Sequence, residues 1–223
     1  MDFNDLKFKH PFTSIVAGIT SSGKTILTRR ILENWKTLIN SNLKSFKVLW
    51  CYGQMQELYS RKIPNVEVIY HKGIPNETDI ENIRPNLIVL DDLMENIKPN
   101  DTITNLFTKK SHHMNISVIF IVQNLFNKEM RTISLNSHYI IVMKGVRITQ
   151  QVGILGRQLF PNKSNEIMKI FKDATSKPFG YLVFDLHPQS NEEFRLRTRI
   201  FKEEIPVPLA QKHSFAPIYY KLE

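Results

Sequence analysis

Short apolar runs alternate with amphipathic segments along most of the chain, and this alternation predicts its secondary structure. Apolar runs of strand length occupy residues 14–18, 47–52, 66–70, 87–90, 117–122 and 139–143. Apolar residues at helical spacing predict helices at residues 24–38 and at about 101–111, 125–136 and 148–160. Continuous apolar runs are typical of parallel strands that are buried on both faces. The pattern therefore predicts an α/β fold with a mostly parallel central sheet flanked by helices.

Two later segments, residues 180–186 and 194–201, predict a C-terminal β-hairpin. The second segment alternates apolar and basic residues, which predicts a strand with one face exposed to solvent. Three prolines follow and predict an extended chain. We therefore expect one domain over residues 1–203, with its core at about 10–186, and an extended, proline-containing tail over residues 204–223.

Composition indicates a packed core and a basic second half. The chain has 223 residues, a length that suits one domain, and 42% of them are hydrophobic, which argues against disorder. The formal net charge is +9. Residues 1–100 carry 13 basic and 11 acidic side chains, whereas residues 101–223 carry 17 and 10. A surplus of +7 in the second half favours a polyanionic partner, nucleic acid before membrane.

The sequence also predicts the compartment. A single cysteine, Cys51, excludes an intramolecular disulfide framework. The N-terminus lacks the basic and apolar regions of a signal peptide, and the longest strongly apolar stretch, 116–122, is far too short for a membrane span. We expect a soluble intracellular protein.

A complete G-x-x-x-x-G-K-[ST] motif follows the first strand and begins the first helix, as a phosphate-binding (Walker A) loop does. Its eight residues are Gly18, Ile19, Thr20, Ser21, Ser22, Gly23, Lys24 and Thr25. The glycines let backbone N–H groups approach phosphates, and the helix N-terminus adds its positive end. In such a loop Lys24 reaches the β- and γ-phosphates, and the Thr25 hydroxyl ligates Mg²⁺. The motif predicts a nucleoside triphosphate site, with ATP and Mg²⁺ as the expected ligands.

Two carboxylates, Asp91 and Asp92, follow the apolar run 87–90. A strand that ends beside the phosphate-binding loop delivers Asp91 to Mg²⁺ as a Walker B acid. Asp92 is then placed to orient and deprotonate the attacking water. An Asp-Asp pair after a strand is also a common helix cap or solvated turn, and the residues alone leave both interpretations open.

Three further polar residues are candidates for catalysis. Gln123 follows the run 117–122 and either contacts the γ-phosphate or the water, or caps the next helix. Arg131 and Arg147 either stabilise transition-state charge at a neighbouring subunit's nucleotide or are solvated surface residues. The pair His112-His113 has no second ligand group at a metal-binding spacing, so it caps a helix end or senses nucleotide state.

Taken together, these segments resemble the poxvirus-type virion packaging ATPases. That family is a branch of the FtsK–HerA group of P-loop DNA motors, and it occurs in nucleocytoplasmic large DNA viruses, virophages and Polinton (Maverick) or adintovirus-like elements. The resemblance covers residues 10–201 and is carried by the loop 18–25, the strand 87–92, the run 111–117 and the Gln123 strand. The stretch 131–136, Arg147 and the stretch 179–185 are similar to Polinton-type members in particular.

The resemblance implies a P-loop fold of the ASCE type, in which the Gln123 strand lies between the Walker A and Walker B strands. It also implies ATP hydrolysis by a ring, a hexamer, that pumps double-stranded DNA into a preformed capsid. Lys24 and Thr25 would hold phosphate and Mg²⁺, Asp91 would be the Walker B acid and Gln123 the sensor. A capsid or portal-vertex protein is the implied partner. The implied location is the host nucleus, a cytoplasmic virus factory or the virion.

One position departs from the wider FtsK–HerA group, which usually has Glu after the Walker B Asp where this chain has Asp92. The side chain of Asp reaches one methylene less far than that of Glu, so this position differs from the family pattern at the residue expected to act as the base. Two other functions remain open: a P-loop nucleotide or nucleoside kinase, and a scaffold that binds ATP without turnover and docks a terminase or capsid protein.

Overall fold

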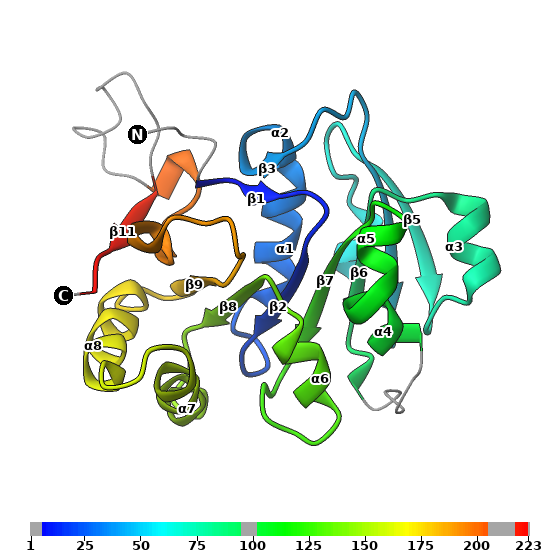
Figure 1. The fold of residues 1–223 in the computed structure, drawn as a ribbon. Helices are drawn as coiled ribbons and strands as arrows, with labels where there is room; N and C mark the ends of the chain where they lie inside the picture. The colour runs from blue at the N-terminus through cyan, green and yellow to red at the C-terminus, as the bar shows by residue number, and fades with distance from the viewer. Residues whose placement is uncertain (1–5, 95–101, 205–216, 223) are drawn as a thin grey trace.

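A central sheet with helices on both sides forms the body of the protein (Figure 1). The computed structural model describes residues 6–94, 102–204 and 217–222. In this part of the chain the main sheet has nine strands in the order β11-β10-β9-β8-β2-β7-β6-β4-β5. The strands are β2 (Thr13–Ala17), β4 (Lys47–Tyr52), β5 (Glu67–Lys72), β6 (Leu87–Asp91), β7 (Ser117–Val122), β8 (Tyr139–Met143), β9 (Tyr181–Asp185), β10 (Leu196–Thr198) and β11 (Ile218–Tyr220).

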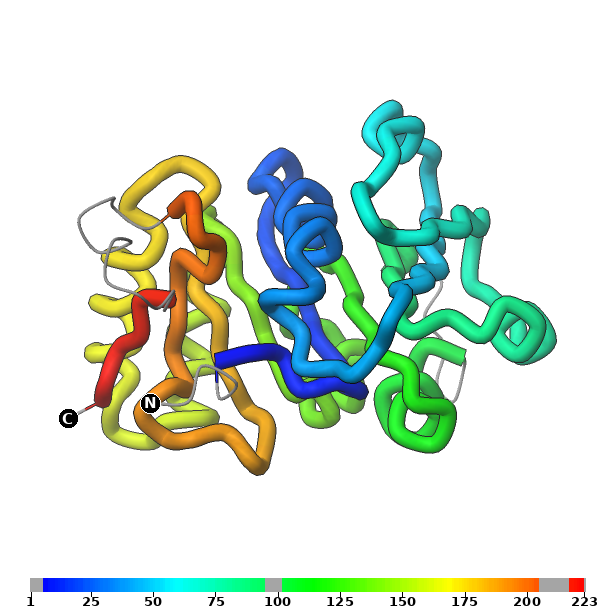
Figure 2. The backbone as a smooth tube through the Cα atoms, turned by 90° about the horizontal axis from the view of Figure 1, so that it is seen from above, coloured from blue at the N-terminus to red at the C-terminus, as the bar shows by residue number. Residues whose placement is uncertain are grey.

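The six strands from β8 to β5 in this order are parallel, whereas β9, β10 and β11 each run antiparallel to the strand before them. A second, two-stranded sheet pairs β1 (Phe8–Lys9) with β3 (Ile39–Asn40). The predicted mostly parallel α/β fold with a C-terminal hairpin is confirmed. Seen from above, β2 and the helix that follows it lie in the middle of the molecule, between the cyan and the orange segments (Figure 2).

The helices cover the two faces of the sheet unequally. Helices α1 (Lys24–Glu33) and α2 (Trp35–Leu38) cover one face, together with the N-terminal segment, residues 6–12. The other face carries α3 (Glu77–Ile83), α4 (Thr102–Asn105), a π-helical turn (Leu106–Lys110), α5 (Ser111–His113), α6 (Met130–Leu135), α7 (Thr149–Leu159) and α8 (Ser164–Ala174). Successive side chains of β2 point to opposite cores, with Ile15 and Ala17 in one and Val16 in the other. Within the described ranges every helix is too short or too polar to span a bilayer.

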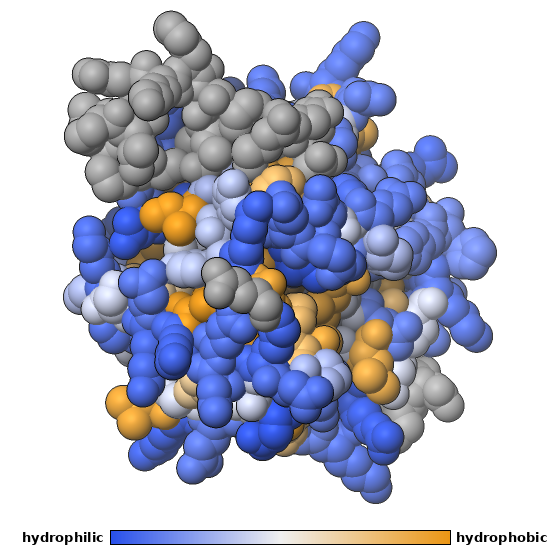
Figure 3. All heavy atoms as spheres, turned by 60° about the vertical axis from the view of Figure 1, so that its left-hand side comes forward, coloured by the Kyte–Doolittle hydropathy of each residue, from blue (hydrophilic) through white to orange (hydrophobic). Residues whose placement is uncertain are grey.

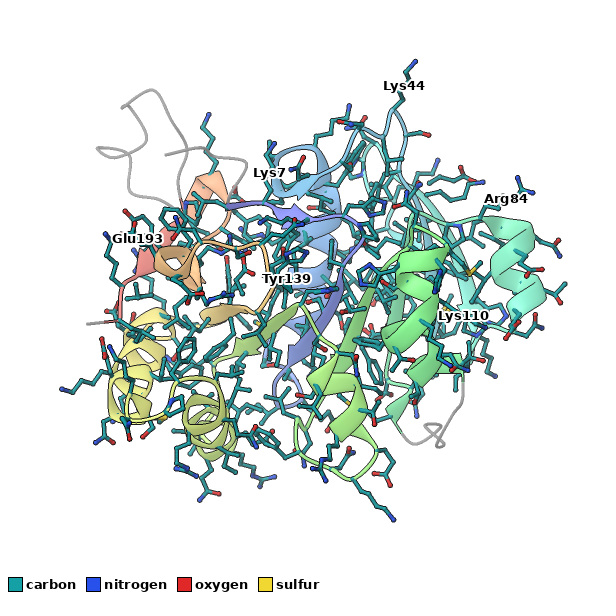
Figure 4. All side chains as sticks on the ribbon, in the orientation of Figure 1. Lys7, Lys44, Arg84, Lys110, Tyr139 and Glu193 are labelled. Atoms are coloured by element: carbon teal, nitrogen blue, oxygen red, sulfur yellow. The ribbon has the colours of Figure 1, made fainter. Side chains whose placement is uncertain are left out.

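Tyr139, at the start of β8, ties the N-terminal segment to the sheet (Figure 4). Its ring receives Phe8 and Phe12 edge-on, with centroids 4.8 and 5.5 Å away, and its hydroxyl accepts a hydrogen bond from the Lys9 backbone N–H at 3.0 Å. Burial raises the pKa of this phenol, so it stays protonated. The contacts fix the chain that leads into β2 and therefore the strand that carries the phosphate-binding loop.

Three predicted helices differ from the structure in their bounds. The predicted helix 24–38 is broken at Asn34 into α1 and α2, because Asn34 leaves the helical region at φ −104° and ψ 22°. The predicted helix 125–136 is wrong over its first turn, since α6 begins at Met130. The predicted helix 101–111 contains a π-helical turn.

The C-terminal hairpin corrects a further expectation, that its second strand has one face exposed. All three residues of β10 are buried, because β11 pairs with its outer edge and the N-terminal segment covers it. Arg197 is 1% exposed, donates to Asp185 Oδ2 at 2.7 Å and donates to the Leu6 carbonyl at 2.8 Å. Much of the predicted tail, residues 205–216, lies outside the described residues.

Candidate nucleotide-binding site

The loop after β2 has the backbone of a compact anion-binding turn. Ser21 and Gly23 adopt positive φ angles of 61° and 94°, and the Ser22 N–H donates to the Ile19 carbonyl at 3.2 Å. Helix α1 begins at Lys24 with no side-chain cap at Gly23 and no acidic residue in its first turn. Its first N–H groups therefore keep their positive end for an anionic ligand.

Gly18 is required by close packing. A Cβ atom at this position would lie 2.6 Å from Ser22 Oγ and 2.8 Å from Met143 Cβ, which is too close for any side chain. The Gly18 N–H donates to the carbonyl of Val122 at 3.2 Å, so the loop stays tied to β7 as it leaves the sheet.

Lys24 lies across its own loop, and its ammonium donates to the Ile19 carbonyl at 2.9 Å. Burial lowers the pKa of Lys24, while the nearby carboxylates of Asp91 and Asp92 raise it. The cation is therefore partly desolvated and held between a carbonyl and two acids. A phosphate that entered the loop would replace the carbonyl as its partner and gain a strong charge-assisted hydrogen bond.

Asp91 ends β6, is 3% exposed and faces Lys24 and the start of α1. Its Oδ2 accepts hydrogen bonds from Thr25 Oγ1 at 3.2 Å and from the Tyr59 hydroxyl at 2.9 Å. Burial raises the pKa of Asp91, and the two hydrogen bonds act against that rise. Tyr59 itself is buried, and burial followed by the charge of Asp91 raises the pKa of its phenol, so it remains a donor.

Asp92 is exposed and adopts a left-handed backbone with φ 58°. This bend lets Asp91 stay within the strand while Asp92 turns out of it. Gly53 makes room for the bend, because a Cβ at Gly53 would lie 2.3 Å from the Asp92 carbonyl oxygen. The Gly53 N–H also donates to the Asp91 carbonyl at 3.0 Å.

One cavity of about 510 Å³ brings most of the predicted site residues together. Its walls include five loop residues, both acids and the exposed amide of Gln123, together with further residues of α1 and β7 and of the segments at positions 56–58, 94 and 179. These residues are Thr20, Ser21, Gly23, Lys24, Thr25, Ile26, Gln56, Leu58, Asp91, Asp92, Met94, Ile121, Val122, Gln123 and Phe179. Gln123 reaches the cavity because β7 lies between β2 and β6, so that the ends of all three strands meet there.

The two candidate arginines do not join this cavity. Arg131 lies on α6 and lines a separate cavity of about 840 Å³. Arg147 is exposed on the loop after β8. His112 lies at the opposite edge of the sheet, where its ring meets that of His138 edge-on at 5.3 Å. His112 and His113 are the last two residues of α5, and the interpretation that they cap the helix stays a prediction.

The oxygens at the site suit Mg²⁺. Thr25 Oγ1 and Asp91 Oδ2 lie 3.2 Å apart, and hydroxyl and carboxylate oxygens are ligands that hard cations prefer. Among the described residues there is no cluster of three or more His, Cys, Asp or Glu able to hold a metal ion. An ion held by these two residues would therefore need phosphate oxygens and water to complete its shell.

The site also contains residues that sequence patterns missed. Tyr59 and Gly53 contact the two acids, yet neither belongs to a motif. They reach the site because β4 and β6 pair in parallel, with Tyr52 opposite Asp91. Tyr59 then returns to that edge on a short 3₁₀ turn, residues Glu57–Ser60.

The glycine-rich loop connects the central strand β2 to helix α1, and the strand that ends in Asp91, β6, is separated from β2 by one strand, β7. This arrangement defines the fold of a P-loop NTPase. Solved structures of such proteins have the same fold. The genome packaging NTPase B204 from Sulfolobus turreted icosahedral virus 2, in complex with sulfate, is similar with a TM-score of 0.56 and 11% identity, over 84% of this chain and 95% of that one. Its complex with ATP-gammaS gives a TM-score of 0.55 and 10% identity over 84% and 96%.

A third similar structure is B204, the DNA-packaging ATPase from Sulfolobus turreted icosahedral virus, with a TM-score of 0.53 and 11% identity over 79% and 94% of the two chains. No protein-family model matches the sequence, and no curated protein matches it either. At such low identity the similarity establishes the P-loop NTPase fold, and the chemistry must be argued from the residues of this chain.

Proposed function

We propose that the protein is an ATP-hydrolysing DNA translocase that packages the double-stranded DNA of a virus or virus-like element into a capsid. The observation that carries the proposal is the convergence of Lys24, Asp91 and Gln123 on one cavity beside a phosphate-binding loop. The fold shared with a genome packaging NTPase over 84% of the chain supports it. The surplus of positive charge in residues 101–223 supports a DNA partner.

In this proposal each polar residue of the cavity has a separate role in ATP hydrolysis. Lys24 and the N-terminus of α1 hold the phosphates. Thr25 and Asp91 would hold Mg²⁺, which supplies positive charge to the phosphate oxygens. Asp92, exposed at the rim, orients the attacking water and takes its proton, and Gln123 contacts the γ-phosphate.

No arginine is among the described residues that line the cavity. In this proposal an arginine of a neighbouring subunit, in a ring such as a hexamer, completes the site. Arg147 is the better placed candidate, because its loop packs on the phosphate-binding loop: a Cβ at Gly145 would lie 3.3 Å from the Ile19 side chain. Arg131 is the second candidate. A capsid or portal-vertex protein would anchor the ring, in the host nucleus, in a virus factory or on the virion.

The test is steady-state ATP hydrolysis with and without double-stranded DNA. The wild-type protein should hydrolyse ATP faster when DNA is present. Lys24→Ala should lower hydrolysis by at least about 100-fold, because it removes a preorganised charge from the transition state. Lys44→Ala is the matched control, since Lys44 is exposed at the periphery of the molecule (Figure 4).

Three outcomes would replace the proposal with another function. Hydrolysis that ignores DNA in an assembled ring would exclude a DNA motor. Transfer of phosphate to a nucleoside or nucleotide, detected by chromatography, would identify a kinase. Binding of ATP without turnover would identify a nucleotide-dependent scaffold.

A further inference from the structure

Phe179 is a large aromatic side chain left in solvent beside the phosphate-binding loop. It is 64% exposed and lines the cavity that contains Lys24 and Asp91. Its ring lies against the loop, since a Cβ placed on Gly23 would be 3.0 Å from Phe179 Cδ1. Exposing a phenylalanine forgoes the free energy of burying it, so this placement calls for an explanation.

The backbone of Phe179 adds to that cost. The Gly180 N–H donates to the Lys177 carbonyl at 3.2 Å, which closes a turn with Pro178 second and Phe179 third. Phe179 has a φ of 59°, the left-handed conformation that the third position of such a turn normally gives to glycine or asparagine. A bulky residue held there is strained, and strain of this kind concentrates at ligand sites.

The turn is also held firmly in place. A Cβ at Gly180 would lie 2.8 Å from both the Ala174 carbonyl oxygen and Thr175 Cα, so the turn packs directly on the end of α8. The Gly180 carbonyl accepts the Lys144 N–H at 2.8 Å, which joins the turn to the end of β8. The ring of Phe179 is therefore presented from a fixed support.

We propose that Phe179, with Ile26, forms the subsite that binds the nucleobase of the nucleotide. Of the apolar side chains that line the cavity, these two are exposed, at 64% and 54%. Both adjoin the phosphate-binding loop: Ile26 follows Thr25, and Phe179 lies on Gly23. Phosphates occupy the charged end of the cavity, and the remaining part of the ligand is a flat aromatic base, which stacks on an aromatic ring.

This inference rests on the proposed nucleotide site and deepens it. Every base has an aromatic face, so stacking on Phe179 supplies affinity without selecting adenine over guanine. The subsite should therefore strengthen the binding of ATP and GTP alike, and contribute nothing to a ligand that has phosphates but no base.

Calorimetric titration of the full chain with Mg-ATP and with Mg-tripolyphosphate tests the subsite. Phe179→Ala should weaken ATP binding by about 5- to 20-fold, the lower part of the range expected for the loss of one stacked base, because the ring is exposed on one side. The affinity for tripolyphosphate should not change. Leu135→Ala is the control, because Leu135 is 77% exposed and lies outside this cavity.

Unchanged ATP affinity in Phe179→Ala would overturn the subsite, and so would an equal loss for ATP and tripolyphosphate, because Phe179 would then act on the phosphate-binding loop. A wild-type protein that binds neither ligand would instead refute the proposed nucleotide site. Phe179→Asn gives an independent measurement. Since asparagine suits the left-handed backbone, its Tm should be at least that of the wild type while its ATP affinity falls. A lower Tm would mean that the ring is there for packing and would overturn the proposal.

Discussion

At the scale of single residues, the site depends on how a buried carboxylate is held. Asp91 is 3% exposed and its Oδ2 accepts from both Thr25 and Tyr59. Tyr59 is itself fixed by neighbouring rings, with centroids 5.3 Å from Tyr70 and 5.6 Å from Trp50. The phenol therefore helps to position the same carboxylate oxygen that Thr25 contacts. In the proposed function it acts through Asp91 and not on the nucleotide.

Replacing this phenol should change the magnesium requirement of hydrolysis. Tyr59→Phe keeps the ring but leaves Asp91 with one hydrogen bond fewer. We expect kcat to fall by about tenfold, since a hydrogen bond to a charged group contributes about 1.5–3 kcal/mol. The Mg²⁺ concentration for half-maximal rate should rise. Hydrolysis measured across a magnesium titration checks both.

Tyr70→Phe is the matched control, because the Tyr70 ring stacks on Tyr59 but its hydroxyl faces Arg29, 3.4 Å away. If both variants lost activity equally with unchanged magnesium dependence, Tyr59 would serve the aromatic cluster and not the carboxylate.

The residues of the site differ in how far the sequence predicts them. Lys24 and Thr25 were predictable because they belong to a motif of eight consecutive residues, whose spacing can be read directly from the sequence. Gln123 and Asp91 followed from strands that end at the same edge of the sheet. Tyr59 was not predictable, since its contact depends on the pairing of β4 with β6 and on a 3₁₀ turn between distant segments.

At the scale of elements, apolar runs identified the parallel strands well because a strand buried on both faces leaves a continuous hydrophobic segment. Helices α3 and α8 were missed although the sequence marks both. Asn76 and Asp79 form a capping box at the start of α3. Helix α8 buries Ile167, Ile170, Phe171 and Ala174 at helical spacing. Strand β11 has three residues and no such pattern, so its pairing depends on β10.

Three histidines lie side by side at the end of the sheet where β8 begins, opposite the end that carries the nucleotide site. The His138 ring lies 5.3 Å from His112 and 4.9 Å from His187. The Thr13 N–H donates to His138 Nδ1 at 3.0 Å, which assigns a ring that is neutral and unprotonated at Nδ1. Burial, and then the neighbouring histidines His187 and His112, lower the pKa of His138 to about 4.

This arrangement predicts a loss of stability in mild acid. Between pH 6.5 and about 4 the unfolded chain binds a proton at His138 that the folded chain does not, so the free energy of unfolding falls as the pH falls. The full shift corresponds to about 3 kcal/mol, and because the ring is only half-buried we expect about 1–2 kcal/mol. Urea unfolding at several pH values measures it.

The control for this prediction is His138→Asn, whose amide oxygen can replace Nδ1 as the acceptor for Thr13 but does not titrate. The difference in stability between wild type and variant should shrink or reverse as the pH falls from 7 to 4. A difference that stays constant would show that His138 does not contribute to the pH dependence.

At the scale of the whole molecule, the structure changes how the positive charge is counted. Arg197 forms a buried ion pair with Asp185, and Arg195 forms an ion pair with Glu192, with Nη2 2.5 Å from Oε1. Two of the three arginines in the hairpin segment 194–201 are therefore engaged with acidic side chains of the same chain. The face that Figure 3 brings forward is largely hydrophilic, with hydrophobic side chains in small patches. In the proposed function, the net charge of +7 in residues 101–223 would attract DNA through exposed side chains such as Arg131 and Arg147.

If these exposed cations bind the DNA backbone, stimulation of ATP hydrolysis by DNA should fall steeply with salt. Each phosphate contact releases a counterion, so about three contacts would weaken DNA binding about 40-fold between roughly 50 and 200 mM salt. The DNA concentration for half-maximal stimulation should rise accordingly. Hydrolysis without DNA, at saturating ATP, should change far less, because a partly buried site is screened less than exposed charges are. Stimulation that is insensitive to salt would mean that the surplus charge serves contacts between subunits or with a capsid protein and not with DNA.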